Sequence, residues 1–391
     1  MTDTPNLKAG AAPVKEDESL NGFWWRHHLQ SIRATARTFG VGLELLRVLI
    51  FHTLWREWTV LSMQLDRLFF PAWRRQRVDR PVFIIGHPRS GTTMLHRSLT
   101  STEDFVVFKF WHLLFPSLTS RKLLGPLMDY LIREGKDVIV PKSVGHLFSL
   151  GAVDEEDFLF LFHALTQFYP PLSGLAFSEQ DFTDIVFCDA LPAKLRRESM
   201  AWLDGCLRRQ ILFTGRQRVV TKMNYSALRV RTLLEAYPDA RIVYLVRSPF
   251  DTIPSHLSLH QNACYHQWGK DRIPSAVLNR YIQRRYQHNV SLYRYMEDLL
   301  AAGDLPESQV ITVRYEDMMQ DLEGEVGRVA AFCNLDLSDE LRSSIAEQAN
   351  VQRGYKREHS NHKMEDFGLT RDDVLRDLGF IFDRYGFERE G

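Results

Sequence analysis

The chain has 391 residues, enough for one large α/β domain or two modest ones with a sizeable core. Lysine plus arginine number 49, as do aspartate plus glutamate, which argues against nucleic acid or an acidic membrane as a bulk partner. Any anion binding therefore has to be local. The four cysteines show no Cys-x-x-Cys spacing, which predicts free thiols, no structural zinc and a reducing, cytoplasmic location.

The N-terminal part of the chain divides into two regions. Residues 1–22 are polar and lack an apolar signal core, so we predict a disordered lead. Residues 23–80 are aromatic and basic, with a helically spaced apolar stripe that includes Leu54, Leu61 and Leu68. Interrupting charges exclude a membrane-spanning helix. Two interpretations stay open: the segment packs on the domain that follows, or it is an interfacial helix that contacts a membrane peripherally and suits a lipid-like substrate.

The third region, residues 81–391, opens with the stretch PVFIIGHPRSGTTMLHRSL. The run Val82–Ile85 is too short for a helix and has the β-branched and aromatic content of a buried strand. A glycine and a turn-prone loop follow, and then the first turns of a helix. Strand, loop and helix N-terminus together form an anion cradle, because free backbone N–H groups and the positive end of the helix dipole face the same point.

The loop differs from a nucleoside-triphosphate loop at its key cation. Gly86 and Gly91 have the required spacing, but Thr92 stands where the lysine should be, and the cation is Arg89. The run Pro-Arg-Ser-Gly-Thr-Thr, in which Arg89, Ser90, Gly91, Thr92 and Thr93 are the candidate binding residues, resembles the 5′-phosphosulfate loop of sulfotransferases. These enzymes use 3′-phosphoadenosine-5′-phosphosulfate (PAPS). The alternative is a basic loop that caps an ordinary helix.

Four adjacent carboxylates, at positions 154–157, precede an apolar run. A solvated helix N-terminus explains them as well as a catalytic role does. A carboxylate whose pKa is raised by burial or by like charges can take the proton of a hydroxyl acceptor. The chain resembles the tyrosylprotein and bacterial sulfotransferases, in which a glutamate downstream of the loop is the base. Glu155 and Glu156 lie in the matching stretch, and we prefer Glu155.

Two further strands end in cations. One short apolar strand ends at Lys222 and another at Arg247, with Ser255 on the helix that follows. Because ligands bind beyond the carboxyl ends of parallel strands, Lys222 is expected to share a crevice with Arg89. An arginine fork with a hydroxyl suits a phosphate monoester. The resemblance implies that Lys222 contacts the sulfuryl group and that Arg247 and Ser255 hold the 3′-phosphate.

Nearer the C-terminus, three individual residues match the family less specifically. Tyr315 follows the last predicted strand, at 309–313, where the resemblance places it near the nucleotide; packing at the sheet edge is the alternative. Arg353 and Lys356 lie in a basic, glycine-containing loop where sulfotransferases close the nucleotide site. A solvated charge run is the alternative there.

We therefore predict an α/β fold with a mostly parallel central sheet flanked by helices, the P-loop-like sulfotransferase fold, over residues 81–391. The resemblance implies transfer of a sulfuryl group from PAPS to a lipid-like or phenolic hydroxyl, leaving 3′-phosphoadenosine 5′-phosphate (PAP), without metal or nucleic acid. Loop amides and threonine hydroxyls would hold the 5′-phosphate, while Arg89 and Lys222 balance developing charge. The alternatives are a phosphotransferase (kinase) on a related fold and a non-catalytic nucleotide-binding scaffold.

Overall fold

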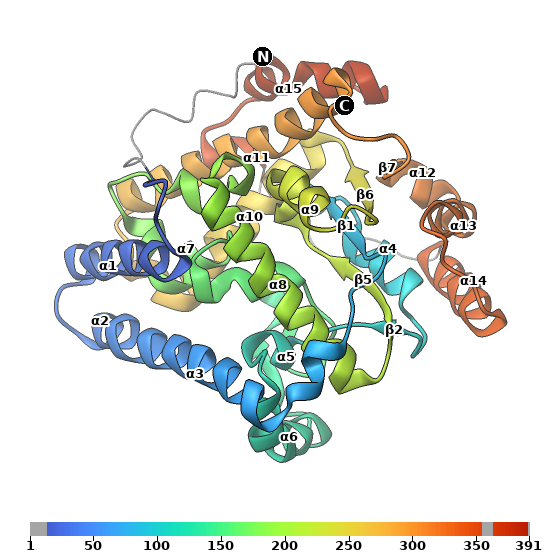
Figure 1. Cartoon of the computed structure of the whole chain (residues 1–391). Coiled ribbons are helices and arrows are strands. Elements are labelled where there is room, and N and C mark those ends of the chain that lie inside the picture. Colours follow the sequence, from blue (N-terminus) through green and yellow to red (C-terminus); the bar gives the residue numbers. More distant parts are fainter. Residues whose placement is uncertain (1–13, 354–362, 390–391) are drawn as a thin grey trace.

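The computed structural model describes residues 14–353 and 363–389 (Figure 1). At its centre, five strands form one sheet in the order β2-β5-β1-β6-β7, and all neighbours are parallel. The strands are β1 (Val82–Gly86), β2 (Phe105–Val106), β5 (Arg218–Lys222), β6 (Arg241–Val246) and β7 (Val310–Arg314). The predicted parallel α/β fold is confirmed.

Strand β1 shows why the sheet strands are continuous apolar runs. All five of its residues are buried. Phe83 and Ile85 belong to one apolar core, whereas Val82 and Ile84 belong to a second core on the opposite face. A strand covered on both faces needs apolar side chains in both directions, so no alternation with polar residues is seen.

Helices cover both faces of the sheet (Figure 1). The second core includes residues from α4 (Thr92–Leu99), α12 (Tyr315–Gln320), α13 (Leu322–Phe332) and α14 (Asp339–Arg353). The larger core includes residues from α8 (Ala193–Thr214), α9 (Val230–Ala236), α10 (Pro249–Trp268), α11 (Ser275–Ala302) and α15 (Arg371–Tyr385). The loops that form the site lie at the carboxyl ends of the strands.

The N-terminal helices pack against the larger core. They are α1 (Leu20–Phe39), α2 (Leu43–Leu46), a π-helix (Arg47–His52) and α3 (Thr53–Phe69). Helix α1 begins at Leu20, so the last three residues of the segment predicted as a disordered lead are helical. Phe23 and Trp24 are buried in the same core as the sheet. The helices α1–α3 lie on the opposite side of the molecule from α13 and α14 (Figure 1).

Helix α3 packs with the face opposite to its apolar stripe. Leu54, Leu61 and Leu68 are 63, 53 and 73% exposed. The buried side instead carries Asp66, whose carboxylate accepts hydrogen bonds from the backbone N–H groups at the start of α6 and pairs with Arg209 at 2.6 Å. The helix therefore packs on the domain that follows through buried polar contacts, while these three leucines face outward.

Further exposed apolar residues lie on α2, on the π-helix and on the antiparallel ribbon of β3 (Val138–Val140) and β4 (Phe148–Ser149), where Phe51 and Ile139 line one cavity. We use the name apolar face for these exposed residues together: Leu43, Leu46, Leu49, Ile50, Phe51, Leu54, Leu61, Leu68, Phe69, Val138, Ile139 and Leu147. Among the described residues, no helix is both long enough and apolar enough to cross a lipid bilayer.

The remaining elements complete the chain. They are α5 (Phe110–Leu114), α6 (Leu118–Arg133), α7 (Tyr169–Ser173) and short 3-10 helices at Pro71–Arg75, Lys142–Val144, Glu156–His163, Leu175–Phe177, Thr183–Ile185, Cys188–Ala190, Asn224–Arg229, Lys270–Arg272 and Met364–Phe367. The four cysteines are free and buried. Within residues 14–353 and 363–389, no cluster of three or more His, Cys, Asp or Glu side chains is arranged to hold a metal ion.

Candidate functional site

The loop between β1 and α4 has a strained, close-packed backbone. Gly91 caps α4 with φ = 91°, and Arg89 takes φ = 78°, a left-handed conformation that is uncommon for residues other than glycine. A Cβ at Gly91 would lie 2.6 Å from Cδ2 of Tyr315, so the tyrosine ring packs directly on the loop. Tyr315 thus lies against the loop, and its proximity to a bound nucleotide stays a prediction.

A cavity of about 1140 Å³ lies over this loop and the carboxyl ends of the strands. We call it the loop cavity. It brings together nine of the predicted site residues, which come from five separate segments of the chain: Arg89, Gly91, Thr92, Thr93, Glu155, Lys222, Arg247, Ser255 and Tyr315.

Two predicted residues whose side chains the structure describes, Ser90 and Glu156, are not among those that line the loop cavity. The Ser90 side chain is buried, and its hydroxyl has no hydrogen-bond partner among the described residues. Glu156 is fully buried behind the lining. Arg353 is the last residue of α14, next to Gln352, which does line the cavity. Lys356 falls outside the described residues.

At one end of the loop cavity, the two sequence motifs meet. Arg89 Nε donates a 2.9 Å hydrogen bond to the Ser255 hydroxyl. Arg247 donates to the Arg89 carbonyl at 3.2 Å, pairs with Asp251 at 3.0 Å and lies 4.0 Å from the centre of the Tyr315 ring. Arg247 Nε is buried and has no hydrogen-bond partner among the described residues. Two guanidinium groups and a hydroxyl therefore converge on one side of the loop.

At the other end, Lys222 projects from the end of β5 toward α4. Its Nζ donates a 3.1 Å hydrogen bond to Thr93 Oγ1. Asp154 Oδ1 and Glu155 Oε2 lie 3.8 and 4.0 Å from the same nitrogen. Only 3% of the Lys222 side chain is exposed, so its charge acts where water screens it weakly.

The acidic run is buried, and its carboxylates bind the segment that follows β5. Glu156 accepts the Lys222 backbone N–H at 2.7 Å, and Glu155 accepts the backbone and side-chain N–H groups of Asn224 at 3.1 and 2.9 Å. Asp157 accepts the Tyr225 N–H at 2.8 Å. The interpretation as a solvated helix N-terminus is therefore wrong: these groups satisfy backbone donors more than 60 residues away.

The surroundings of these carboxylates shift their pKa values in different directions. Burial raises the pKa of Glu155 well above its ordinary value and that of Glu156 to about 8. For Asp154, burial also raises the pKa, but the hydrogen bond with His146 and the Lys222 charge outweigh it, so the net shift is downward. At neutral pH, Asp154 is thus the charged neighbour of Lys222, and the ionised fraction of Glu155 grows as the pH rises.

Two features of the site were not predicted from the sequence: the presence of His146, and the pairing of Asp154 with it. His146 Nε2 lies 3.1 Å from Asp154 Oδ2, and both residues line the loop cavity. Asp154 was visible as the first member of the acidic run. His146 lies between β3 and β4 with no motif around it, so no signal in the sequence marks it.

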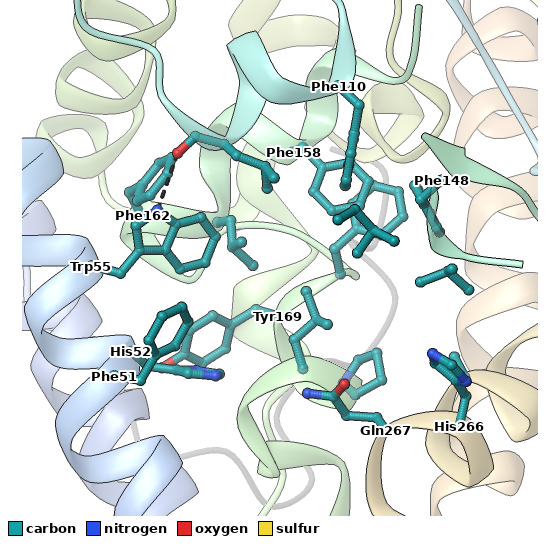
Figure 2. A pocket seen from close by; sticks show the side chains of 18 of the residues that line it. Phe51, His52, Trp55, Phe110, Phe148, Phe158, Phe162, Tyr169, His266 and Gln267 are labelled. Atoms are coloured by element: carbon teal, nitrogen blue, oxygen red, sulfur yellow. Dashed lines mark hydrogen bonds between the residues drawn. The ribbon is translucent and has the colours of Figure 1, made fainter. Parts of the chain in front are cut away.

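A second cavity has a volume of about 300 Å³, and its lining is drawn in Figure 2. It adjoins the loop cavity, with which it shares lining residues. We call it the aromatic cavity. Its aromatic lining residues are Trp24, Phe51, Trp55, Phe110, Phe148, Phe158, Phe162, Phe168 and Tyr169. Four residues line both cavities: His146, Phe148, Phe168 and Leu259.

Comparison with known proteins identifies relatives of this chain. Residues 81–339 match the family described as the sulfotransferase family. The chain is 27% identical over 318 residues to the omega-hydroxy-beta-dihydromenaquinone-9 sulfotransferase Stf3 of Mycobacterium bovis, covering 80% of this chain and 76% of that protein, and the Stf3 of Mycobacterium tuberculosis matches equally.

Two solved structures share the fold. Sulfotransferase STF9 from Mycobacterium avium has a TM-score of 0.70 at 16% identity, covering 97% of this chain and 100% of that one. Sulfotransferase STF1 from Mycobacterium tuberculosis has a TM-score of 0.63 at 20% identity, covering 94% of both chains. The likeness extends over nearly the whole chain, including the N-terminal helices.

Proposed function

Since this chain belongs to the sulfotransferase family, we propose that it transfers the sulfuryl group of PAPS to the hydroxyl of a lipid-like or phenolic acceptor. The observation that carries the proposal is the pair of cationic subsites in one cavity. Lys222 ends β5 and Arg247 follows β6, the two strands on either side of β1, and both line the cavity with Ser255. A nucleotide with both a 5′-phosphosulfate and a 3′-phosphate needs two such subsites, whereas ATP needs one cradle and magnesium ligands.

The donor set fits the nucleotide. The backbone N–H groups at the N-terminus of α4, with the hydroxyls of Thr92 and Thr93, suit the 5′-phosphate. Arg247, whose buried Nε has no partner among the described residues, and Ser255 suit the 3′-phosphate. Tyr315 packs between the loop and Arg247 and would position both. Arg353 and Lys356 stay our candidates for a basic segment that closes over the nucleotide.

The catalytic step needs charge stabilisation and a base. In the proposed step, the acceptor oxygen attacks the sulfur in line, the bond from sulfur to the bridging phosphate oxygen breaks, and the acceptor proton moves to a carboxylate. Lys222 and Arg89 stabilise charge on the sulfuryl oxygens and the leaving phosphate. We assign the base to Glu155, which lines the cavity 4.0 Å from Lys222 Nζ. Glu156, bound to the Lys222 backbone, is assigned to positioning that lysine.

The acceptor is proposed to be an apolar molecule that carries a hydroxyl group. The relative Stf3 is named for a hydroxylated menaquinone, and the aromatic cavity adjoins the loop cavity here. The apolar face beside it is proposed to contact a membrane surface peripherally, because exposed leucines and phenylalanines of this extent are typical of an interaction site.

Nucleotide binding and labelled transfer test this proposal against its two rivals. In a thermal-shift titration, we expect PAP to raise the melting temperature and ATP to leave it unchanged; the reverse result would favour the kinase. We also expect isotopically labelled PAPS to pass its label to a hydroxylated apolar acceptor. Binding of PAP without transfer to any class of hydroxyl would favour the non-catalytic scaffold.

A further inference from the structure

The aromatic cavity lies between two parts of the chain that are distant in sequence. Figure 2 shows Phe51, His52 and Trp55 on one side, from the π-helix and the start of α3, and His266 and Gln267 on the opposite side, from the end of α10. A volume of about 300 Å³ gives room for a chain on the order of ten carbon atoms, if each needs about the 30 Å³ of a water molecule.

Several polar groups around the aromatic cavity are already bonded. Trp55 Nε1 donates to the Leu114 carbonyl at 3.1 Å, and Tyr169 pairs its hydroxyl with His28 at 3.2 Å. Arg56 pairs with Glu57 at 2.7 Å. The rings therefore present mainly carbon surface to the interior, and such a cavity selects apolar ligands over charged ones.

The aromatic cavity joins the catalytic end to the apolar face. His146 and Phe168 line both cavities. Phe51 and Ile139 also line the aromatic cavity, and they are 59 and 51% exposed. The aromatic cavity therefore adjoins both the loop cavity that contains Lys222 and exposed apolar side chains.

We propose that the aromatic cavity binds the hydrocarbon chain of a linear alcohol, with the terminal hydroxyl presented at the loop cavity. The chain of the alcohol enters from a lipid bilayer through a mouth formed by Phe51 and Ile139. The inference rests on the proposed function and adds to it the shape of the acceptor: a flexible acyl- or isoprenoid-like chain with the reacting hydroxyl at its end. The depth of the cavity then sets the preference for chain length.

Filling the aromatic cavity tests this inference. Ala263 lines it from α10 and is not among the described residues that line the loop cavity, so Ala263→Phe is chosen to occupy part of the aromatic cavity. The control is Ala301→Phe, at an exposed position of α11. The acceptors are two isoprenoid alcohols with the same hydroxyl end, the five-carbon 3-methyl-2-buten-1-ol and the ten-carbon geraniol, and the readouts are kcat/KM with labelled PAPS and the affinity for PAP.

We expect the wild-type protein and Ala301→Phe to prefer geraniol by about tenfold or more, because the longer chain buries more apolar surface. In Ala263→Phe, this ratio should fall close to one, with the five-carbon activity and PAP affinity retained. Should Ala263→Phe fail to fold by circular dichroism, Leu172→Trp narrows the same cavity from α7.

Two outcomes separate this inference from the proposed function. An unchanged chain-length ratio in the filled variants would overturn the inference while leaving sulfuryl transfer intact. Absence of transfer to both alcohols and to every other hydroxyl tested, with PAP still bound, would overturn the proposed function itself.

Discussion

Lys222 Nζ donates a 3.1 Å hydrogen bond to Thr93 Oγ1, although 129 residues separate the two in the sequence. The bond ties the end of β5 to the first turn of α4, and so holds a buried cation over the helix N-terminus. The positive end of the helix dipole and the lysine charge then act on the same point. An anionic group transferred above Thr93 would meet both.

The Arg247 and Ser255 subsite predicts discrimination between nucleotides. We expect Arg247→Lys and Ser255→Ala to weaken PAP binding by about 10- to 100-fold, since hydrogen bonds to charged groups contribute about 1.5–3 kcal/mol. Adenosine 5′-phosphate, which lacks the 3′-phosphate, should bind the variants and the wild type equally. Isothermal titration calorimetry with both nucleotides measures the difference. Equal losses for both would contradict the assignment of this subsite.

The assignment of Glu155 as base predicts a pH-dependent kcat. Burial raises the Glu155 pKa well above its ordinary value, so kcat should climb as rising pH ionises this carboxyl. Glu155→Gln keeps the shape of the side chain and should lower kcat by about 100-fold or more while flattening the profile. Glu134→Gln, at an exposed position, is the matched control. If kcat instead rose with pH only in the acidic range and was constant above it, the base would be Asp154, because the pKa of that group is lowered.

The buried Glu156 predicts that stability falls with increasing pH. Its pKa is about 8 in the folded protein against 4.5 in the unfolded chain, so the folded state binds the additional proton between those values. The free energy of unfolding should therefore decrease as the pH rises from about 5 to 8, by up to about 4 kcal/mol at roughly 1.4 kcal/mol per pKa unit.

Glu156→Gln tests this linkage. The amide cannot ionise, so the variant should lose this part of the pH dependence and be more stable than the wild type at pH 8. Urea unfolding at pH 5, 6.5 and 8 gives the two curves. Parallel curves for the two proteins would show that Glu156 is not the titrating group.

The apolar face predicts binding to lipid vesicles. Replacing Leu54 and Leu61 with aspartate removes two exposed apolar side chains from α3, and sedimentation with phosphatidylcholine vesicles should fall by about tenfold or more, since each leucine contributes about 1.5–3 kcal/mol when buried. Gln64→Asp, at an exposed position of the same helix, controls for added charge. Equal sedimentation of all three proteins would remove the case for membrane contact.

The sheet and the placement of the loop were predictable because the signals are local. A strand buried on both faces is a continuous apolar run, and such runs end at Gly86, Lys222 and Val246. The rule that ligands lie beyond the carboxyl ends of parallel strands then predicts one crevice for Arg89 and Lys222, which the structure places in the lining of the same cavity.

Other features depend on contacts that periodicity does not reveal. The apolar stripe of α3 faces outward because Asp66 binds Arg209, 143 residues away, from the opposite side of the helix. The buried state of the acidic run depends on donors near Lys222, and the His146–Asp154 pair depends on how the β3–β4 ribbon folds back. Helical spacing shows that a stripe exists but not which side of the helix the core takes.

Transfer from isotopically labelled PAPS by the wild type and by Lys222→Ala tests whether this protein moves a sulfuryl group with the help of Lys222. We expect label to appear on the hydroxyl of an apolar alcohol with the wild type. In Lys222→Ala, kcat should be at least about 100-fold lower, a loss of about 3 kcal/mol of transition-state stabilisation. Lys270→Ala, at an exposed position, should behave as the wild type. Equal rates for Lys222→Ala and the wild type, or no transfer to any hydroxyl while PAP is bound, would contradict the account.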